Sequence, residues 1–259
     1  MSPAQLDLFE NPLARARRLK AQRKFSEAKR ILEHLLELQP ENNAAKASLA
    51  DLHYRTGKLR KALVLAGEIL ARDPDDPRAL IVAGNVMLKK KKPEQALEHF
   101  ELALKVAETD YLWLRVAACR LELKQPEAAL DAIERAGRLS SEPSPETLRL
   151  QLEAARLMDD IEEAEKLFTV ALEMAPEDPR RFASFVISLA GKFKSVEAAR
   201  LSAVARQREG QNENPDLLLF EARNLLRARK LDEAAEVLGH LENLQLEQRQ
   251  QKELARLLR

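Results

Sequence analysis

Cysteine, glycine and aromatic residues are all scarce in this sequence. Its 259 residues include one cysteine, Cys119, only 7 glycines and 4% aromatic residues. A lone cysteine excludes an intrachain disulfide, and a reducing compartment is the simplest explanation for it. The β-branched and aromatic residues that strands favour are sparse, whereas alanine, leucine, glutamate, lysine and arginine are abundant. This composition predicts helices throughout the chain.

Strong net charge and long apolar runs are also missing. The 43 Lys and Arg residues nearly balance 42 Asp and Glu residues, which leaves a net charge of +1. No strong overall field therefore attracts nucleic acid or an anionic membrane. No stretch approaches the roughly 20 apolar residues of a membrane span, and the N-terminus lacks the basic and apolar order of a secretory signal. We therefore predict a cytoplasmic protein without a membrane partner.

One spacing recurs along the chain. The segments KFSEAKRILEHLLELQP, KLRKALVLAGEILARDP and KPEQALEHFELALKVAE align on Ala28, Ala62 and Ala96, at steps of 34 residues. The series continues through Ala129, Ala164, Ala198 and Ala234 at steps of 33, 35, 34 and 36. A fixed period of this length is the signature of a repeat architecture. Seven units in register predict an array of helical hairpins.

The pattern resembles the tetratricopeptide repeat (TPR) family, whose unit of about 34 residues reads W-x2-L-G-x2-Y, then A-x3-F, then P. Ala83-Gly84, Ala96 and Phe100 fit the third unit, and Trp113 fits the tryptophan position of the fourth. The closing proline is present at Pro40, Pro74 and Pro176 and is replaced at Glu108, Ser141 and Gly210. The resemblance implies an all-α TPR superhelical solenoid of about seven helix-turn-helix repeats with a C-terminal capping helix.

The register predicts how the chain is divided. Residues 1–11 are expected to form a tail, 12–246 the repeat array and 247–259 a capping helix. The seven units are expected at approximately 12–42, 43–76, 77–109, 110–143, 144–178, 179–214 and 215–246. The last segment, EQRQQKELARLLR, is amphipathic, so it is interpreted as the solvating cap that a repeat array needs. The alternative is that this helix binds a partner.

The sequence also indicates where helices begin and where two helices cross closely. Asn11-Pro12 is typical of an N-cap followed by proline at the first helical position, and Pro93 and Pro126 are expected to begin second helices in the same way. The small residues Ala28, Ala50 and Gly84 are expected where two helices cross closely, because a larger side chain would push the helices apart.

The sequence contains no recognisable catalytic or metal-binding pattern. The four histidines, His34, His53, His99 and His240, lack carboxylates or cysteine at ligand spacing. No G-x-S-x-G, P-loop or H-E-x-x-H motif is present. Asp159-Asp160 is better explained by helix capping than by acid–base chemistry. We therefore predict a protein that is not an enzyme and has no metal or cofactor.

TPR arrays generally bind peptides or helices in a concave groove lined by the first helix of each unit. The resemblance therefore implies a non-enzymatic protein–protein interaction scaffold. The groove-facing candidates are Arg17, Lys20, Asp51, Tyr54, Arg55, Arg78, Asn85, Lys89, Tyr111, Arg115, Arg149, Arg156 and Arg223. Arginine forks suit carboxylates, so the partner is predicted to be an acidic or C-terminal segment. The alternative is that these residues are solvated or paired within their own helices.

The N-terminal tail contains a separate short motif, QLDLF. It comprises Gln5, Leu6, Asp7, Leu8 and Phe9. The motif is similar to the pentapeptide by which bacterial proteins bind the DNA polymerase sliding clamp. It implies an alternative function, that of a bacterial accessory protein tethered to the clamp. The other interpretations are that Leu6 and Phe9 pack on the first repeat, or that the tail binds a different partner.

Two basic stretches, Arg15–Lys24 and Lys89–Lys92, are not interleaved with the aromatic residues that stack on bases. Direct nucleic-acid binding is therefore disfavoured. Self-association is left open by the sequence.

Overall fold

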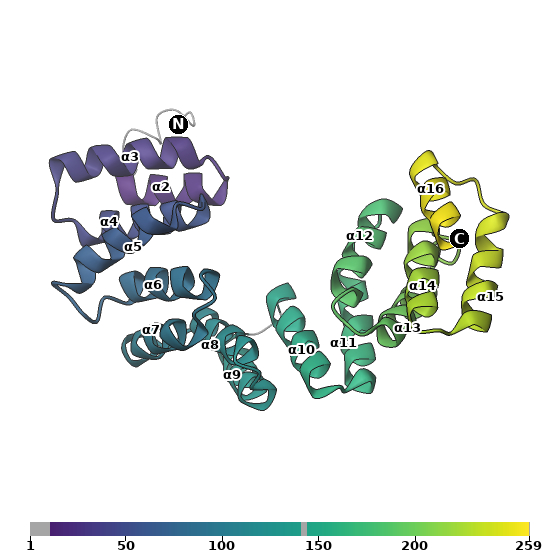
Figure 1. Ribbon diagram of the computed structural model, residues 1–259. Coiled ribbons are helices and arrows are strands. Elements are labelled where there is room, and N and C mark those ends of the chain that lie inside the picture. The colour runs from purple at the N-terminus through teal and green to yellow at the C-terminus, as the bar shows by residue number, and fades with distance from the viewer. Residues whose placement is uncertain (1–10, 141–143, 259) are drawn as a thin grey trace. The chain divides into compact units, whose positions relative to one another are not determined.

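The computed structural model describes residues 11–140 and 144–258, and these residues form α-helices joined by short turns, with no strand among them (Figure 1). The all-α helical-repeat prediction is confirmed. The chain divides into two compact units, residues 1–142 (unit 1) and 143–259 (unit 2). The repeat register alone did not indicate this division.

The helices follow one another as pairs in each unit. Unit 1 contains α2 (Pro12–Ala21), α3 (Phe25–Leu38), α4 (Asn43–Arg55), α5 (Leu59–Leu70), α6 (Pro77–Lys89), α7 (Pro93–Val106), α8 (Asp110–Glu122) and α9 (Pro126–Leu139). Unit 2 contains α10 (Pro145–Met158), α11 (Ile161–Glu173), α12 (Pro179–Ala190), α13 (Ser195–Arg206), α14 (Pro215–Arg227), α15 (Leu231–Glu242) and α16 (Gln248–Leu257). Even-numbered helices up to α14 are the first helices of the pairs, and odd-numbered ones are the second helices.

The first helices α2, α4 and α6 each pack against their own second helix and against a helix of the next pair. In unit 1, α4 contacts α5 within its pair, and it also contacts α3, α2 and α6. One hairpin cannot bury both of its apolar faces, so stacking of successive hairpins is what completes the core. This stacking sets the first helices α2, α4, α6 and α8 side by side.

The helix starts occur where the sequence indicates. The Asn11 side chain accepts a hydrogen bond from the backbone N–H of Leu13 at 2.9 Å, and Pro12 is the first helical residue. Pro93 and Pro126 begin α7 and α9. A proline is well tolerated there because the first backbone N–H groups have no helical partner. These three boundary predictions are confirmed.

The turn between paired helices has a feature that the sequence does not reveal. Arg23, Lys91, Lys124, Asp159 and Arg229 have positive φ values between 58° and 61° at equivalent turns, although none is glycine. The corresponding residue between α4 and α5 is Gly57, with φ +77°. Left-handed backbone costs non-glycine residues free energy. Turn geometry, rather than residue preference, therefore decides the conformation at most of these positions.

Small residues allow the close crossings inside each pair. Ala28 and Ala50 are fully buried. A Cβ atom added at Gly84 would lie 2.7 Å from the ring of Phe100, which is itself fully buried. This contact shows that Gly84 needs a small side chain, and for Ala28 and Ala50 the same expectation stays a prediction.

Helix α16, interpreted from its sequence as a cap, packs against α14 in unit 2. Leu254 and Leu257 are partly buried against the cluster that contains Leu241 and Val237 of α15. Leu258, which follows Leu257 at the end of the helix, is 62% exposed.

The buried titratable residues have structural surroundings. Burial, reinforced by Lys61 and Lys58, lowers the pKa of His53, and burial also lowers the pKa of His99. Burial raises the pKa of the Cys119 thiol to about 12, which keeps the thiol protonated and unreactive. Within the described ranges, no cluster of three His, Cys, Asp or Glu side chains is placed to hold a metal ion. No helix of that part of the chain is long and apolar enough to cross a membrane.

Candidate functional site

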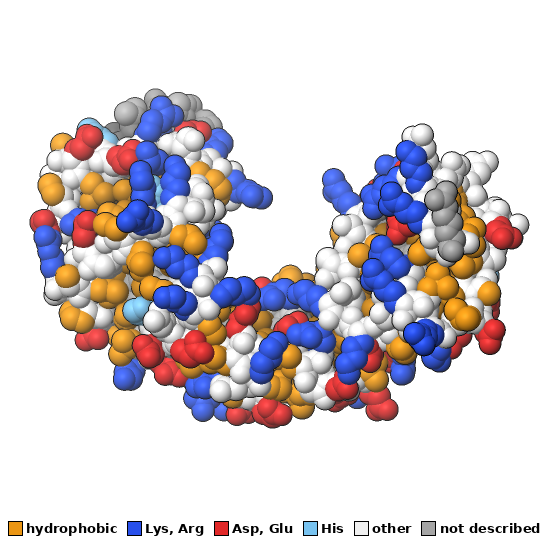
Figure 2. All heavy atoms as spheres, in the orientation of Figure 1, with side chains coloured by type: hydrophobic (Ala, Val, Ile, Leu, Met, Phe, Trp, Pro, Cys, Tyr) orange, Lys and Arg blue, Asp and Glu red, His pale blue; other side chains and the backbone are white. Residues whose placement is uncertain are grey.

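The candidate site of unit 1 is the surface formed by the first helices α2, α4, α6 and α8, here called the first-helix face. Along each of these helices, apolar residues at intervals of three and four turn into the hairpin core, as Ala45, Leu49 and Leu52 do in α4. The remaining stripe carries the polar and aromatic candidates. Figure 2 shows Lys and Arg side chains clustered over the visible side of this unit.

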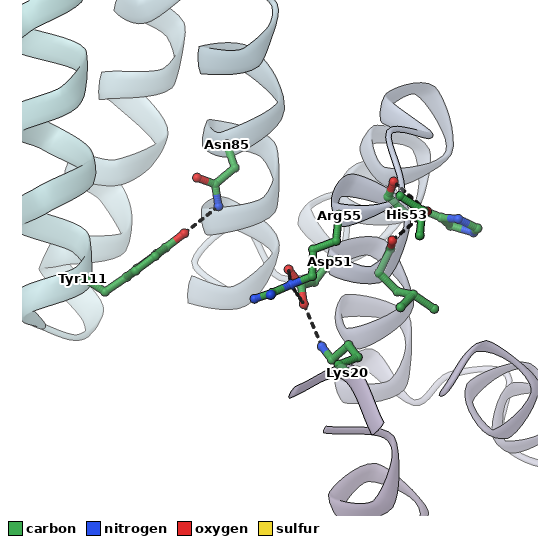
Figure 3. Close-up of polar contacts among 8 residues, drawn as sticks. Lys20, Asp51, His53, Arg55, Asn85 and Tyr111 are labelled. Atoms are coloured by element: carbon green, nitrogen blue, oxygen red, sulfur yellow. Dashed lines mark hydrogen bonds and ion pairs between the residues drawn. The ribbon is translucent and has the colours of Figure 1, made fainter. Parts of the chain in front are cut away.

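An ion-pair network joins α2 to α4. Lys20 Nζ donates to Asp51 Oδ2 at 2.7 Å, and Arg55 Nε donates to both oxygens of the same carboxylate at 3.1 Å (Figure 3). The Lys20 and Asp51 side chains are only 13% and 26% exposed. In the close-up, His53 lies on the other side of α4 from this network. Asp51 therefore neutralises two of the predicted groove cations.

Aromatic residues continue the face from α4 to α6. The Lys89 ammonium lies 5.5 Å from the centre of the Tyr54 ring, in a cation–π arrangement. Burial raises the pKa of Tyr54, and the nearby Tyr111 adds to this effect while Arg115 opposes it. Tyr111 and Arg115 belong to α8, and both affect the pKa of Tyr54 in α4. These three side chains therefore lie near one another.

A hydrogen bond joins α6 to α8. Asn85 Nδ2 donates to the Tyr111 hydroxyl at 2.9 Å (Figure 3), and Asn85 is only 5% exposed. The Arg115 guanidinium lies 5.3 Å from the centre of the Tyr111 ring. A buried amide needs a hydrogen-bond partner, so the tyrosine hydroxyl holds Asn85 in place while the Tyr111 ring stays exposed at the surface.

Cations exceed anions on the first-helix face. Arg17, Arg78 and Lys89 are exposed and form no ion pair with any described residue. The only acidic candidate, Asp51, already bonds to Lys20 and Arg55. The face therefore offers positive charge that its own carboxylates do not neutralise.

The predicted cations of unit 2 are arranged differently. Arg149 donates to Glu146 through two nitrogens at 3.1 and 2.9 Å, and Arg156 donates to Glu153 through two nitrogens in the same way. Hydrogen bonding to these carboxylates raises the pKa of both arginines. For these two residues the structure favours pairing within their own helix, which the sequence left open. Their role in a partner groove stays a prediction.

Other residues singled out from the sequence have local roles. The Asp160 side chain accepts from the backbone N–H of Glu163 at 2.9 Å, so it caps α11 as expected. Asp159 forms an ion pair with Lys194. The clamp-like motif, residues 5–9, lies outside the described residues.

Two cavities were not predicted. One, of about 380 Å³, lies beside Trp113 in unit 1, where Arg135 stacks 4.7 Å from the indole ring. The other, of about 470 Å³, lies in unit 2 among α12, α14 and α16. Both are lined by residues from at least three helices, so no single segment of the sequence carries a signal for them.

The comparisons with known proteins agree with this helix arrangement. Residues 19–85, from the end of α2 into α6, match the family model described as tetratricopeptide repeat. The TPR resemblance is confirmed over these residues. In the matched TPR region, Ala28, Ala62 and Gly84 occupy the small-residue positions that the sequence pattern indicated.

The individual matches are partial or distant. The chain is 30% identical over 104 residues to the BBSome complex member bbs-4 of Caenorhabditis elegans, which corresponds to 39% of this chain and 22% of that protein. The chain thus spans about a fifth of the length of this relative.

Two solved structures have a similar fold. The thermophilic TPR protein TTC0263 of Thermus thermophilus has a TM-score of 0.59 at 23% identity, over 69% of this chain and 97% of that one. The APC/C hetero-tetramer Cut9-Hcn1 has a chain with a TM-score of 0.65 at 14% identity, over 98% of this chain and 51% of that one. At these identities the likeness establishes the fold alone.

Proposed function

We propose that this TPR chain is a non-enzymatic interaction scaffold whose first-helix face in unit 1 binds a peptide or helix of a partner protein. TPR proteins are generally interaction scaffolds. One observation carries the assignment of the face: side-chain contacts join its four first helices in succession, through Lys20–Asp51, Lys89–Tyr54 and Asn85–Tyr111. Rigid side chains positioned in advance lose little entropy on binding.

The partner segment is proposed to be acidic. The exposed Arg17, Arg78 and Lys89 are not neutralised by carboxylates of the described residues. Arginine binds carboxylates in a bidentate geometry, and the exposed ring of Tyr111 supplies apolar contact area. A peptide that combines carboxylates with an apolar anchor would complement both features. A cytoplasmic location for this scaffold stays a prediction.

The test is a charge reversal on the first-helix face. Arg78→Glu/Lys89→Glu is expected to remove the partners that the wild-type chain captures, and to weaken binding of an acidic test peptide at least tenfold, because the face would repel carboxylates. Affinity capture with mass spectrometry and fluorescence anisotropy measure the two effects. Binding of the acidic peptide by the wild-type chain is expected to weaken as salt is added.

A matched control makes the same change of charge elsewhere in unit 1. Arg60→Glu/Lys105→Glu alters two exposed cations on the second helices α5 and α7, which lie outside the first-helix face. This control is expected to retain the partners. If both double variants lose them equally, the effect reflects net charge and the proposed site is wrong.

A second candidate function rests on QLDLF. We propose as the alternative that residues 5–9 bind the bacterial sliding clamp. Gln5 can both donate and accept hydrogen bonds, and Leu6, Leu8 and Phe9 are suitable anchors for an apolar cleft. The motif precedes α2, which begins at Pro12, and lies outside the repeat register.

Calorimetry with purified clamp tests this alternative. A peptide of residues 1–11 is expected to bind, whereas Gln5→Ala and Leu8→Ala/Phe9→Ala peptides are expected to lose binding because the polar contact or the anchors are missing. The absence of binding at tens of micromolar native peptide would remove the hypothesis. A lowered melting temperature of the chain without residues 1–10 would instead favour packing of the tail on the first repeat.

A further inference from the structure

A second surface lies in unit 2, where α16 packs against α14 (Figure 1) and its N-cap residue Glu247 pairs with Arg180 of α12. Three polar pairs hold α16 there: Glu247–Arg180, Gln250–Asp216 and Glu253–Arg223. The N-cap residue Glu247 and the α16 residues Gln250 and Glu253 recur at intervals of three, so they form one stripe along the helix. All three of their partners belong to the first helices α12 and α14.

Gln250 is the anchor of this arrangement. It is 7% exposed, its Nε2 donates to Asp216 Oδ1 at 3.0 Å, and its Oε1 accepts from the backbone N–H of Glu247 at 2.9 Å. The side-chain amide of Gln250 therefore caps the start of α16 and also binds this helix to α14. Leu254 and Leu257 complete the attachment, each only partly buried.

Helix α16 does not fill the surface that it covers. The cavity of about 470 Å³ remains between α16 and the pair α12 and α14. Its walls include the apolar side chains of Ile187 and Phe220, together with Arg180 and Arg223. The surface thus presents two cations and the carboxylate of Asp216 beside Ile187 and the largely buried Phe220, and α16 leaves space above them.

The attachment of α16 is weak in physical terms. The side chains of Arg180 and Glu247 are 75% and 56% exposed, and ion pairs exposed to this extent contribute little to stability. Within α16 only Gln250 is buried. A helix of 10 residues is marginal in water without tertiary support. Helix α16 is therefore expected to open locally at a lower free energy than α14, which contributes many core residues.

We propose that the surface of α12 and α14 beneath α16, here called the α12–α14 face, is a docking surface for an amphipathic helix of a partner protein. Helix α16 is its exchangeable intramolecular occupant. The fitting partner helix carries carboxylates six positions apart, as Glu247 and Glu253 do in α16, and apolar residues beside the second carboxylate, as Leu254 and Leu257 do. Such a helix competes with α16 for Arg180 and Arg223. The proposal rests on the proposed function, because the α12–α14 face is built from first helices as the first-helix face of unit 1 is, but its experiment changes only residues of unit 2.

The experiment uses the full chain and a labelled peptide of residues 244–259 as the probe. Glu247→Arg/Glu253→Arg in the chain places cations against Arg180 and Arg223, so α16 is expected to detach. This opened chain is expected to bind the native peptide at least tenfold more tightly than the wild-type chain, whose face is occupied. The affinity is expected to fall as salt is raised, because ion pairs orient the peptide.

Charge exchange provides the specificity control. Arg180→Glu/Arg223→Glu also opens the face, and this chain is expected to bind only a peptide with both glutamates changed to arginine. As a matched control, Glu162→Arg/Glu173→Arg on α11 alters two exposed glutamates and is expected to bind as weakly as wild type. Equal binding of the native peptide by both opened chains, or binding by neither, would overturn the proposal.

A measurement on the unmodified chain does not depend on whether the variants fold. Hydrogen exchange is expected to show lower protection in α16 than in α14, with a further decrease at high salt. Protection of α16 equal to that of α14 and insensitive to salt would show that α16 is a permanent part of unit 2, and would likewise overturn the proposal.

Discussion

Glu221→Ala is expected to lower the free energy of unfolding of unit 2 by about 3–5 kcal/mol, because it leaves a buried charge without its partner. The Glu221 and Arg206 side chains are 7% and 15% exposed, and two hydrogen bonds of 2.8 and 3.2 Å join them between α13 and α14. Arg206 also donates to the carbonyl of Asn212 at 3.1 Å, which fixes the turn between these helices. Urea unfolding followed by circular dichroism measures the loss.

Two variants separate this effect from a general loss of charge. Glu233→Ala removes an exposed partner of Lys230 and is expected to change stability by no more than about 0.5 kcal/mol. Arg206→Met/Glu221→Leu removes both charges together and is expected to recover much of the stability, since apolar residues of similar size often replace a buried pair without loss. A loss of less than about 1 kcal/mol in Glu221→Ala would contradict the buried-pair interpretation.

Gly84→Val is expected to destabilise unit 1 by about 1–3 kcal/mol or more, because the α6–α7 crossing has no room for a side chain. A Cβ atom at this position would lie 2.7, 2.8 and 3.0 Å from three ring carbons of Phe100. Phe100 is fully buried, so its ring cannot move into solvent. The single tryptophan, Trp113, belongs to unit 1, and its fluorescence during urea unfolding measures the change.

Another helical glycine gives the opposite expectation. Gly67 lies in α5, is exposed and has no heavy atom within 4 Å of an added Cβ. Gly67→Ala is expected to raise stability by about 0.5–1 kcal/mol, because alanine loses less backbone entropy in a helix. Adding Phe100→Leu to Gly84→Val is expected to cost less than the sum of the two single changes, since the smaller side chain relieves the contact. Strict additivity would contradict the proposed contact.

The helical framework could be predicted because its causes are local. Apolar spacing along α3, prolines such as Pro93 at helix starts and the small residue Gly84 each act within one repeat, and repetition strengthens the same signal along the chain. Non-local features were not predictable in this way. Arg23 and Lys91 have a left-handed backbone conformation although neither is glycine, so residue type does not predict these turns. The adjoining helices impose the conformation.

The candidate site was only partly accessible to sequence reasoning. The periodicity predicts that Lys20 and Asp51 lie on first helices, but their 2.7 Å contact depends on how α2 and α4 stack. The same limit applies to Asn85 and Tyr111, which are 26 positions apart in the chain. Arg149 and Arg156 look equivalent to the cations of unit 1 in sequence, yet local glutamates pair with them.

The sequence by itself determined the pattern of helical hairpins, their approximate boundaries and the positions that need small side chains. It also lacks an apolar run long enough for a membrane span. These properties follow from residue spacing and local conformational preference. Only the tertiary structure decided the division into two units, the pairing of Arg206 with Glu221 and the attachment of α16 to α12 and α14. These contacts join residues 15 or more positions apart. Whether such side chains meet depends on how the helices are stacked, because the repeat spacing sets which helix a residue lies on but leaves its long-range partner undetermined.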